Sequence, residues 1–104
     1  ISTEAYLSHI FSHFKKNQDH VTSLLFSKND YFLRQLQKEL EHHVYPMVAK
    51  DLQVSYPNIP ASYLKHFVVT NFIETLTWWL KKGKSYKEDQ VVGFYLDVLA
   101  MNSR

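Results

Sequence analysis

The sequence contains no cysteine among its 104 residues. A chain without cysteine forms no disulfide, offers no thiolate nucleophile and builds no cysteine-type zinc site. This composition fits a cytoplasmic protein, and we expect that location. The chain also lacks any apolar run near the roughly 20 residues that a membrane-spanning helix needs, and it shows no signal peptide, so we predict no membrane partner.

Glycine and proline are scarce, with two and three residues respectively. Because these residues make most sharp turns, the sequence favours a few long helices over many short strands. The only glycines are Gly83 and Gly93, which excludes a glycine-rich phosphate-binding loop. Hydrophobic residues make up 45% of the chain, which is enough for a packed core, so we predict one all-α domain over residues 1–104.

A strong charge of either sign is also missing, since the formal net charge is +2 and the lysines are scattered. No basic run with interleaved aromatic residues is present, so this segment by itself is not predicted to bind nucleic acid. The sequence begins at Ile1 without an initiator methionine. We therefore expect it to be a piece of a longer protein.

The N-terminal half shows the periodicity of amphipathic helices, which we place at residues 3–16, 18–26 and 30–52. Ser2 or Thr3 and then Asn29 are suitable N-caps. Pro46 lies inside the third helix, where it removes a hydrogen-bond donor and clashes with the preceding turn. We therefore expect a kink near residues 42–46, or a break followed by another helix, which gives five or six helices in all.

The C-terminal half predicts two apolar helices after a loop at residues 54–60. The first runs over residues 60–82, and Gly83 is predicted to end it in the left-handed conformation. Ser85 and Glu88 match a capping box that opens the last helix. From Val91 to Met101 only Gly93 and one aspartate are not apolar, so these helices carry more apolar surface than one stripe can bury.

This surplus predicts a four-helix dimer interface formed by the last two helices of two copies. The alternatives are burial inside a larger protein, or a five-helix monomer that wraps the two helices. The predicted interface residues are Thr70, Asn71, Glu74, Trp78, Val91, Phe94, Tyr95, Val98 and Met101. Trp79 is expected in the core, whereas Trp78 is expected to face a cavity or a partner.

In the C-terminal half a proline precedes a long apolar helix that ends in Trp-Leu-x-x-Gly, and a capping box then opens an apolar terminal helix. This arrangement resembles the C-terminal domain of TetR-family transcriptional regulators. The residues concerned are Ile59-Pro60, Trp79-Leu80-Lys81-Lys82-Gly83 and Ser85-Tyr86-Lys87-Glu88. The resemblance extends to the helices that line the effector cavity of the family, which are similar to residues 13–17, 24–25, 32–33 and 36 of this sequence. Within it, the chain is most similar to the group of dihydroxyacetone-kinase regulators.

The resemblance implies a homodimer that binds a small-molecule effector and controls transcription through DNA. The family reads DNA with an N-terminal helix-turn-helix domain, which this sequence does not contain, so no DNA-contacting residue is assigned. Polar residues on apolar helices and aromatic residues near the expected kink are the candidate ligand-binding positions. They are His13, Phe14, His42, Tyr45, Tyr63, Phe67, Asn71, Glu74 and Trp78.

The six histidines raise the question of a metal site. His9 and His13 are spaced for one helix face, but no third ligand follows at a recognisable spacing, and we predict no metal and no other cofactor. Asp19 and His20 are adjacent and point in different directions on a helix, so we predict no enzyme. Two other functions stay open. One is a stand-alone helical module that binds a protein partner, and the other is a monomeric carrier of a hydrophobic molecule.

Overall fold

The computed structural model describes residues 2–100, which form six α-helices and one π-helical turn and contain no strand. In chain order the elements are α1 (Thr3–Lys16), α2 (Gln18–Phe26), α3 (Asp30–Glu39), η1 (Leu40–Val44), α4 (Tyr45–Ser55), α5 (Ala61–Lys81) and α6 (Glu88–Ala100). The all-α prediction is confirmed. The bounds predicted for α1 and α2 agree residue for residue, and those predicted for α5 differ by one residue at each end.

Two of the predicted N-caps are confirmed by their hydrogen bonds. The backbone N–H of Ala5 donates to Ser2 Oγ across 3.1 Å, and that of Phe32 donates to Asn29 Oδ1 across 2.9 Å. Each cap satisfies a donor of the first helical turn that has no partner inside the helix. These short side chains therefore fix where α1 and α3 begin.

The long third helix is interrupted at η1, as the position of Pro46 predicted. The N–H of Tyr45 reaches back five residues to the carbonyl of Leu40, which is the pattern of a π-helical turn, and Pro46 occupies the first turn of α4. A proline has no N–H and is best tolerated at a helix start, so the chain widens by one residue before it and then begins a new helix.

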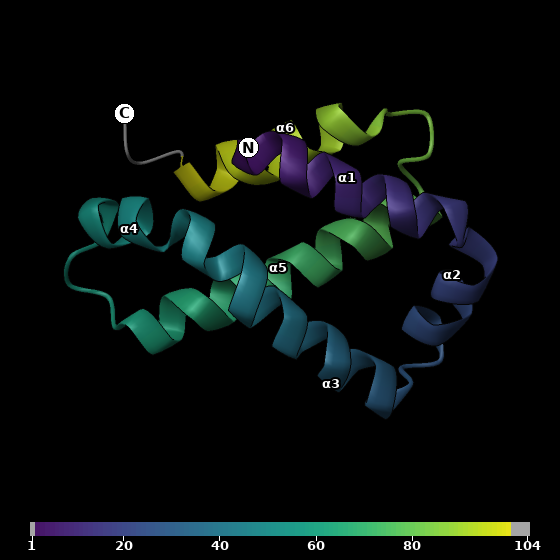
Figure 1. The fold of residues 1–104 in the computed structure, drawn as a ribbon, viewed down its shortest axis with the longest axis horizontal. Coiled ribbons are helices and arrows are strands. Elements are labelled where there is room, and N and C mark those ends of the chain that lie inside the picture. The colour runs from purple at the N-terminus through teal and green to yellow at the C-terminus, as the bar shows by residue number, and fades with distance from the viewer. Residues whose placement is uncertain (1, 101–104) are drawn as a thin grey trace.

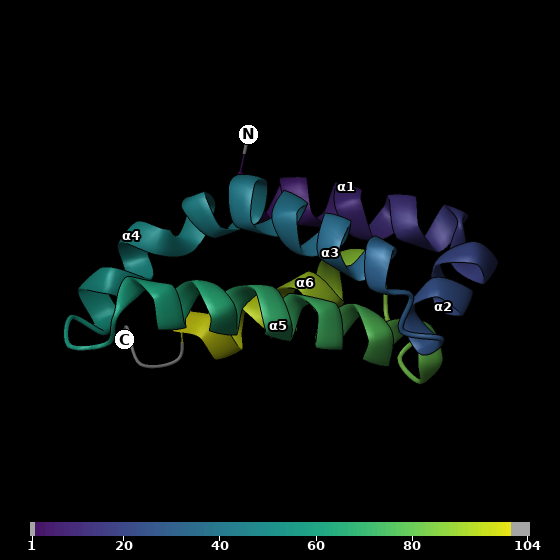
Figure 2. The ribbon, with the colours of Figure 1, turned by 90° about the horizontal axis from the view of Figure 1, so that it is seen from below.

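The helices form two layers, which Figure 2 shows edge-on. α1, α3 and α4 make one layer, α5 and α6 make the other, and α2 closes one end (Figure 1). The described chain measures 40 × 28 × 24 Å along its principal axes. One side of the α5–α6 layer is covered by the other layer, and no other helix of residues 2–100 lies on its opposite side. That uncovered side carries the candidate site.

The core between the layers is built around Phe11, Phe72 and Trp79. The ring of Phe11 stacks on Trp79 with centroids 5.3 Å apart and meets Phe72 edge-on at 5.2 Å. These rings come from α1 and α5, so their packing joins the two layers. Trp79 is only 1% exposed, which confirms it as a core residue, whereas Trp78 is 41% exposed, and its contact with a partner stays a prediction.

Two predictions for the turn between α5 and α6 are wrong. Gly83 does not adopt a left-handed conformation, since no glycine of the described residues has a positive φ. A glycine is required there for another reason, because a Cβ atom would lie 2.7 Å from the indole ring of Trp78. The predicted capping box of Ser85 and Glu88 is not formed either. α6 begins at Glu88 itself, and the carboxylate of Glu88 points to α1.

Candidate dimerisation surface

The uncovered side of the α5–α6 layer gathers five large apolar side chains that stay in contact with solvent. We refer to the surface formed by these residues and the polar residues between them as the α5–α6 face. Its members are Phe67, Asn71, Glu74, Thr75, Trp78, Tyr86, Phe94 and Val98. On α5 the residues of the face are spaced by four or seven positions, as in Phe67, Asn71 and Glu74, and on α6 Phe94 and Val98 are four positions apart. Residues with these spacings lie on one side of a helix.

A groove of about 490 Å³ runs along this face between α5 and α6. Val91, Tyr95 and Leu99 form its floor and are at most 5% exposed. The prediction of Val91 and Tyr95 as interface residues is therefore corrected, because α5 and α6 already bury both side chains against each other. Phe94 and Val98, which were predicted with them, are 44% and 60% exposed and stand at the surface.

Three aromatic rings support one another at one end of the face. Trp78 stacks on Tyr86 with centroids 5.9 Å apart, and Tyr86 meets Phe94 edge-on at 5.2 Å. The missing side chain of Gly83 leaves the room in which the Trp78 indole lies. Rings held in this way lose little conformational freedom when a partner covers them, which favours their use in an interface.

The polar residues of the face differ in whether they already have hydrogen-bond partners. Asn71 Nδ2 donates to the carbonyl of Phe67 across 2.9 Å, and Thr75 Oγ1 donates to the carbonyl of Asn71 across 2.6 Å. The carboxylate of Glu74 has neither a hydrogen bond nor an ion pair with the described residues. Glu74 is therefore the residue of the groove whose charge is unbalanced.

A buried tyrosine holds α6 in place below the groove. The hydroxyl of Tyr95 donates to the backbone carbonyl of Val68 across 2.6 Å, and its ring meets Phe72 edge-on. Burial raises the pKa of the Tyr95 hydroxyl far above its ordinary value, because the phenolate would be poorly solvated there. The tyrosine thus fixes the position of α6 on α5 while staying neutral.

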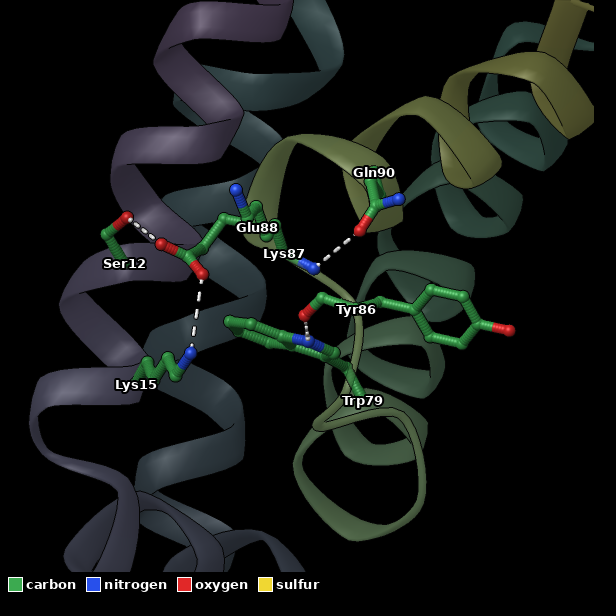
Figure 3. A network of polar contacts seen from close by, with 7 residues as sticks. All are labelled: Ser12, Lys15, Trp79, Tyr86, Lys87, Glu88 and Gln90. Carbon is green, nitrogen blue, oxygen red and sulfur yellow. Dashed lines mark hydrogen bonds and ion pairs between the residues drawn. The ribbon is translucent and has the colours of Figure 1, made fainter.

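A polar network joins the start of α6 to α1 (Figure 3). Ser12 Oγ donates to a carboxylate oxygen of Glu88 across 3.0 Å, and the other oxygen lies 3.6 Å from Lys15 Nζ. Lys15 Nζ also lies 5.7 Å from the centre of the Trp79 ring. The hydrogen bond from Ser12 holds the pKa of Glu88 below its ordinary value, and a hydrogen bond from the backbone N–H of Glu88 and the nearby charge of Lys15 lower this pKa further.

Sequence reasoning missed this network because its partners are far apart in the chain. Ser12 and Glu88 are separated by 76 residues. Glu88 was instead interpreted as a capping residue of its own helix. The backbone N–H of Lys87 is satisfied by Gln90 Oε1 across 2.9 Å, which leaves the Glu88 side chain free to reach α1 (Figure 3).

The nine predicted ligand-binding residues are not brought together in one place. Four of them lie on the α5–α6 face: Phe67, Asn71, Glu74 and Trp78. Phe14 lines a second groove of about 380 Å³ between α1 and α3–η1, together with Tyr6, Phe32 and His43. His13, His42 and Tyr63 are exposed elsewhere, and Tyr45 is buried with its hydroxyl 3.5 Å from the carbonyl of Ala61.

The ligand-binding residues that we expected near the kink, His42 and Tyr45, do not line the groove beside it. The groove next to the π-helical turn is lined by His43 and Val44 on its other side. His42 turns back along its own helix, where its Nδ1 lies 2.7 Å from the carbonyl of Lys38. The hollow beside the kink therefore faces α1, and neither of the two predicted residues lines it.

One predicted interface residue of the described chain, Thr70, falls outside the α5–α6 face. Thr70 lies on the flank of α5 and lines a different hollow, which it shares with Glu41 of η1 and His66. Met101 lies outside the described residues. Within residues 2–100, no three histidine, aspartate or glutamate side chains are grouped as metal ligands, and no helix has the length and hydropathy needed to cross a membrane.

Comparison with known proteins defines the class to which this fold belongs. A family described as the C-terminal region of transcriptional regulators, TetR_C_8, matches residues 2–99. A solved structure of a TetR transcriptional regulator from Streptococcus agalactiae 2603V is 39% identical and superposes with a TM-score of 0.77. That match covers 95% of this chain and 56% of the other chain. A search of curated proteins gave no significant match.

The fold and these matches define the C-terminal, regulatory type of helical domain found in transcription regulators. The chain belongs to the TetR family of transcriptional regulators, and its residues correspond to the C-terminal region of that family. It spans about half the length of the relative from Streptococcus agalactiae. The narrower assignment to the dihydroxyacetone-kinase regulators stays a prediction.

Proposed function

We propose that this chain is the dimerising and effector-sensing part of a TetR-type regulator whose DNA-reading domain precedes it. The observation that carries this proposal is the uncovered apolar face on α5 and α6 in a chain that belongs to the TetR family. The face would pair with the same face of a second copy and form a four-helix bundle. No catalytic role is assigned.

The energetics of the face support pairing with an apolar surface. Trp78, Phe94 and Val98 are each between 41% and 60% exposed, and Phe67 and Tyr86 lie beside them. Burying apolar surface is worth about 25 cal/mol per Å² removed from water. A surface that gathers several exposed apolar side chains, with two aromatic ring contacts and one charge, is typical of an interaction site, whereas single exposed apolar residues are not.

Dimerisation through this face restricts where an effector can bind. A second copy would cover Phe67, Asn71, Glu74 and Trp78, so these residues would be interface residues in the dimer. Of the predicted ligand-binding residues, Phe14 is the one that lines the α1–α3 groove, which a second copy on the α5–α6 face leaves open. We therefore assign the effector to that groove, where apolar walls favour an apolar molecule.

The dimer is tested by sedimentation equilibrium on Val98→Asp and its matched control Val54→Asp. Val98 lies on the α5–α6 face, whereas Val54 lies on α4 and is 74% exposed. Both changes place a charge on an exposed valine. A charge inside the bundle costs several kcal/mol, so Val98→Asp should be monomeric at concentrations where the wild type and Val54→Asp are dimeric.

The opposite results would separate the alternatives. A wild-type chain that is monomeric at high micromolar concentration would refute the dimer and favour a module that binds another protein or a hydrophobic molecule. A dimer that survives Val98→Asp and dissociates with Val54→Asp would place the interface on α4. Circular dichroism of each variant shows that a loss of association is not a loss of folding.

The effector assignment is tested with 8-anilinonaphthalene-1-sulfonate, a fluorescent apolar probe. Fluorescence should rise when the probe is added to the dimer, and Phe14→Ala should reduce its affinity by about tenfold, because one aromatic wall of the groove is lost. Tyr31→Ala, which removes an aromatic ring that is 69% exposed on α3, is the control. Equal binding by all three proteins would remove the α1–α3 groove as the effector site.

A further inference from the structure

The groove of the α5–α6 face contains one carboxylate, that of Glu74, and it has no partner within the described chain. Its neighbours on α5 at this face are Asn71 and Trp78, and the residues across the groove are Phe94 and Val98 of α6. The other titratable group of the lining is the hydroxyl of Tyr95, which donates to the carbonyl of Val68. Glu74 is therefore an exposed and unpaired carboxylate on a surface whose other residues are neutral.

Cations on the same helix are directed elsewhere. Lys81 Nζ lies 5.6 Å from the centre of the Phe26 ring, toward α2. Lys65 and His66 line the hollow that faces α3 and η1. On α6 the charged residue nearest to Phe94 and Val98 in the sequence is Asp97, which has the same sign as Glu74. None of the residues that line the groove is basic.

The symmetry of a two-fold interface decides what a partner can offer to Glu74. In such an interface each copy contributes the same surface, so the groove of one protomer meets the groove of the other. The partner then brings aromatic and aliphatic side chains, the amide of Asn71, the hydroxyl of Thr75 and a second carboxylate. The Thr75 proton is already donated to the carbonyl of Asn71, and no lysine, arginine or histidine comes from the groove.

We propose that dimerisation is linked to the uptake of protons at Glu74, so that the dimer becomes tighter as the pH falls. This inference rests on the proposed function, because it requires the α5–α6 face to be the interface. Burial in apolar surroundings and a like charge both favour the neutral carboxylic acid over the carboxylate. In the neutral form the acid gains an O–H donor, and Asn71 Oδ1 of this same surface is an available acceptor.

The test is the dimer dissociation constant at pH 5.5, 6.5, 7.5 and 8.0, measured by sedimentation equilibrium at constant ionic strength. For each proton taken up, Kd changes by about tenfold per pH unit within the titration range. We expect the wild-type Kd to fall by at least about tenfold from pH 8.0 to pH 5.5. Glu74→Gln, which mimics the neutral acid, should be tight at pH 8.0 and lose most of this dependence.

Glu41→Gln is the matched control, because Glu41 is an exposed glutamate of η1 that lines the hollow beside α3. It should keep the wild-type slope of Kd against pH. A wild-type dimer that weakens as the pH falls would show that a cation pairs with Glu74 and would overturn proton uptake. A dimer with no pH slope, or a slope that Glu74→Gln keeps in full, would overturn it as well.

Failure of the underlying dimer gives a different result. If the α5–α6 face is not the interface, the wild type is monomeric at every pH, or Val98→Asp remains dimeric, and both proposals fall. If Val98→Asp dissociates the dimer and the pH slope is missing, the interface stands and proton uptake alone is refuted.

Discussion

The indole Nε1–H of Trp79 donates a hydrogen bond to the backbone carbonyl of Tyr86 across 3.0 Å (Figure 3). The residue that fills the centre of the core therefore also fixes the turn that carries Tyr86. Because the ring of Tyr86 contacts Trp78 and Phe94, this single bond links the core to the α5–α6 face.

The first prediction concerns this link. Trp79→Phe should lower the free energy of unfolding by about 2–4 kcal/mol, because it removes part of a fully buried side chain and leaves the Tyr86 carbonyl without its donor. Trp78→Phe removes the same atoms from a half-exposed ring and should cost about 1 kcal/mol or less. Urea unfolding followed by circular dichroism measures both. Equal losses for the two variants would contradict the packing described for Trp79.

The two glycines should respond to alanine with opposite signs. At Gly83 an added Cβ would lie 2.7 Å from the Trp78 ring, so Gly83→Ala should destabilise the protein by about 1 kcal/mol and displace the ring from Tyr86. At Gly93 nothing lies within 4 Å, so Gly93→Ala should stabilise α6 by about 0.5–1 kcal/mol. Thermal unfolding gives both signs, and near-ultraviolet circular dichroism should change only for Gly83→Ala.

The third prediction isolates the hydroxyl of Tyr95. Tyr95→Phe keeps the ring and removes the hydrogen bond to Val68, so the free energy of unfolding should fall by about 1 kcal/mol. The exposed Tyr31 supplies the control, since Tyr31→Phe should change nothing measurable.

The pKa of Tyr95 is raised above its ordinary value of 10.0, so the unfolded chain loses this proton before the folded chain does. Stability should therefore decrease as the pH rises above about 10, and this decrease should be smaller in Tyr95→Phe. An absorbance titration of phenolate should show one tyrosine that ionises only when the protein unfolds. A wild type in which all tyrosines ionise together while folded would contradict the burial of this hydroxyl.

The fourth prediction concerns Glu88. Its pKa is below the ordinary value of 4.5, so the folded protein binds fewer protons than the unfolded chain in the range just below that value. The contribution of the Ser12 and Lys15 contacts to the free energy of unfolding is therefore fully present above about pH 4.5. It is lost as the pH falls through the lowered pKa of Glu88. Glu88→Gln should be less stable than the wild type at pH 7, by about 1 kcal/mol or less, and similar to it near pH 3.

The matched control for Glu88 is Glu39→Gln. Glu39 Oε2 lies 3.3 Å from His43 Nε2, one turn along the same stretch of helix, so its carboxylate joins no two distant segments of the chain. Its replacement should change stability less than Glu88→Gln does at pH 7. A stability difference between Glu88→Gln and the wild type that persists at pH 3 would show that the carboxylate charge is not the cause.

The sequence predicted the helices well because their signals are local. Ser2, Asn29 and Pro46 each act within one helical turn, so a cap or a break can be recognised from a few neighbouring residues. The 100° between successive residues on a helix points Trp78 and Trp79 in different directions, and the resemblance to the TetR family assigned Trp79 to the core. These features require no knowledge of how distant segments pack.

The errors arise where a distant residue provides the deciding contact. Glu88 has the spacing of a capping residue, but Ser12 and Lys15 of α1 compete for its carboxylate. The predicted set of ligand-binding residues also mixed two surfaces. Periodicity shows that Phe14 and Phe67 lie on the apolar sides of their helices, but it does not show which groove each residue lines. The arrangement of the two layers, which decides this, is encoded in contacts between segments far apart in the chain.

The π-helical turn at Leu40–Val44 contains one residue more than an α-helical path would need. Each residue turns an α-helix by about 100°, so this extra residue sets the rotational phase of α4 relative to α3. Deleting one residue of the turn would rotate Tyr45 and Leu52, both buried, away from the core. Chain length at this turn is therefore constrained in a way that no single side chain reveals, and a one-residue deletion here should be tolerated far less than one in the loop at residues 56–60.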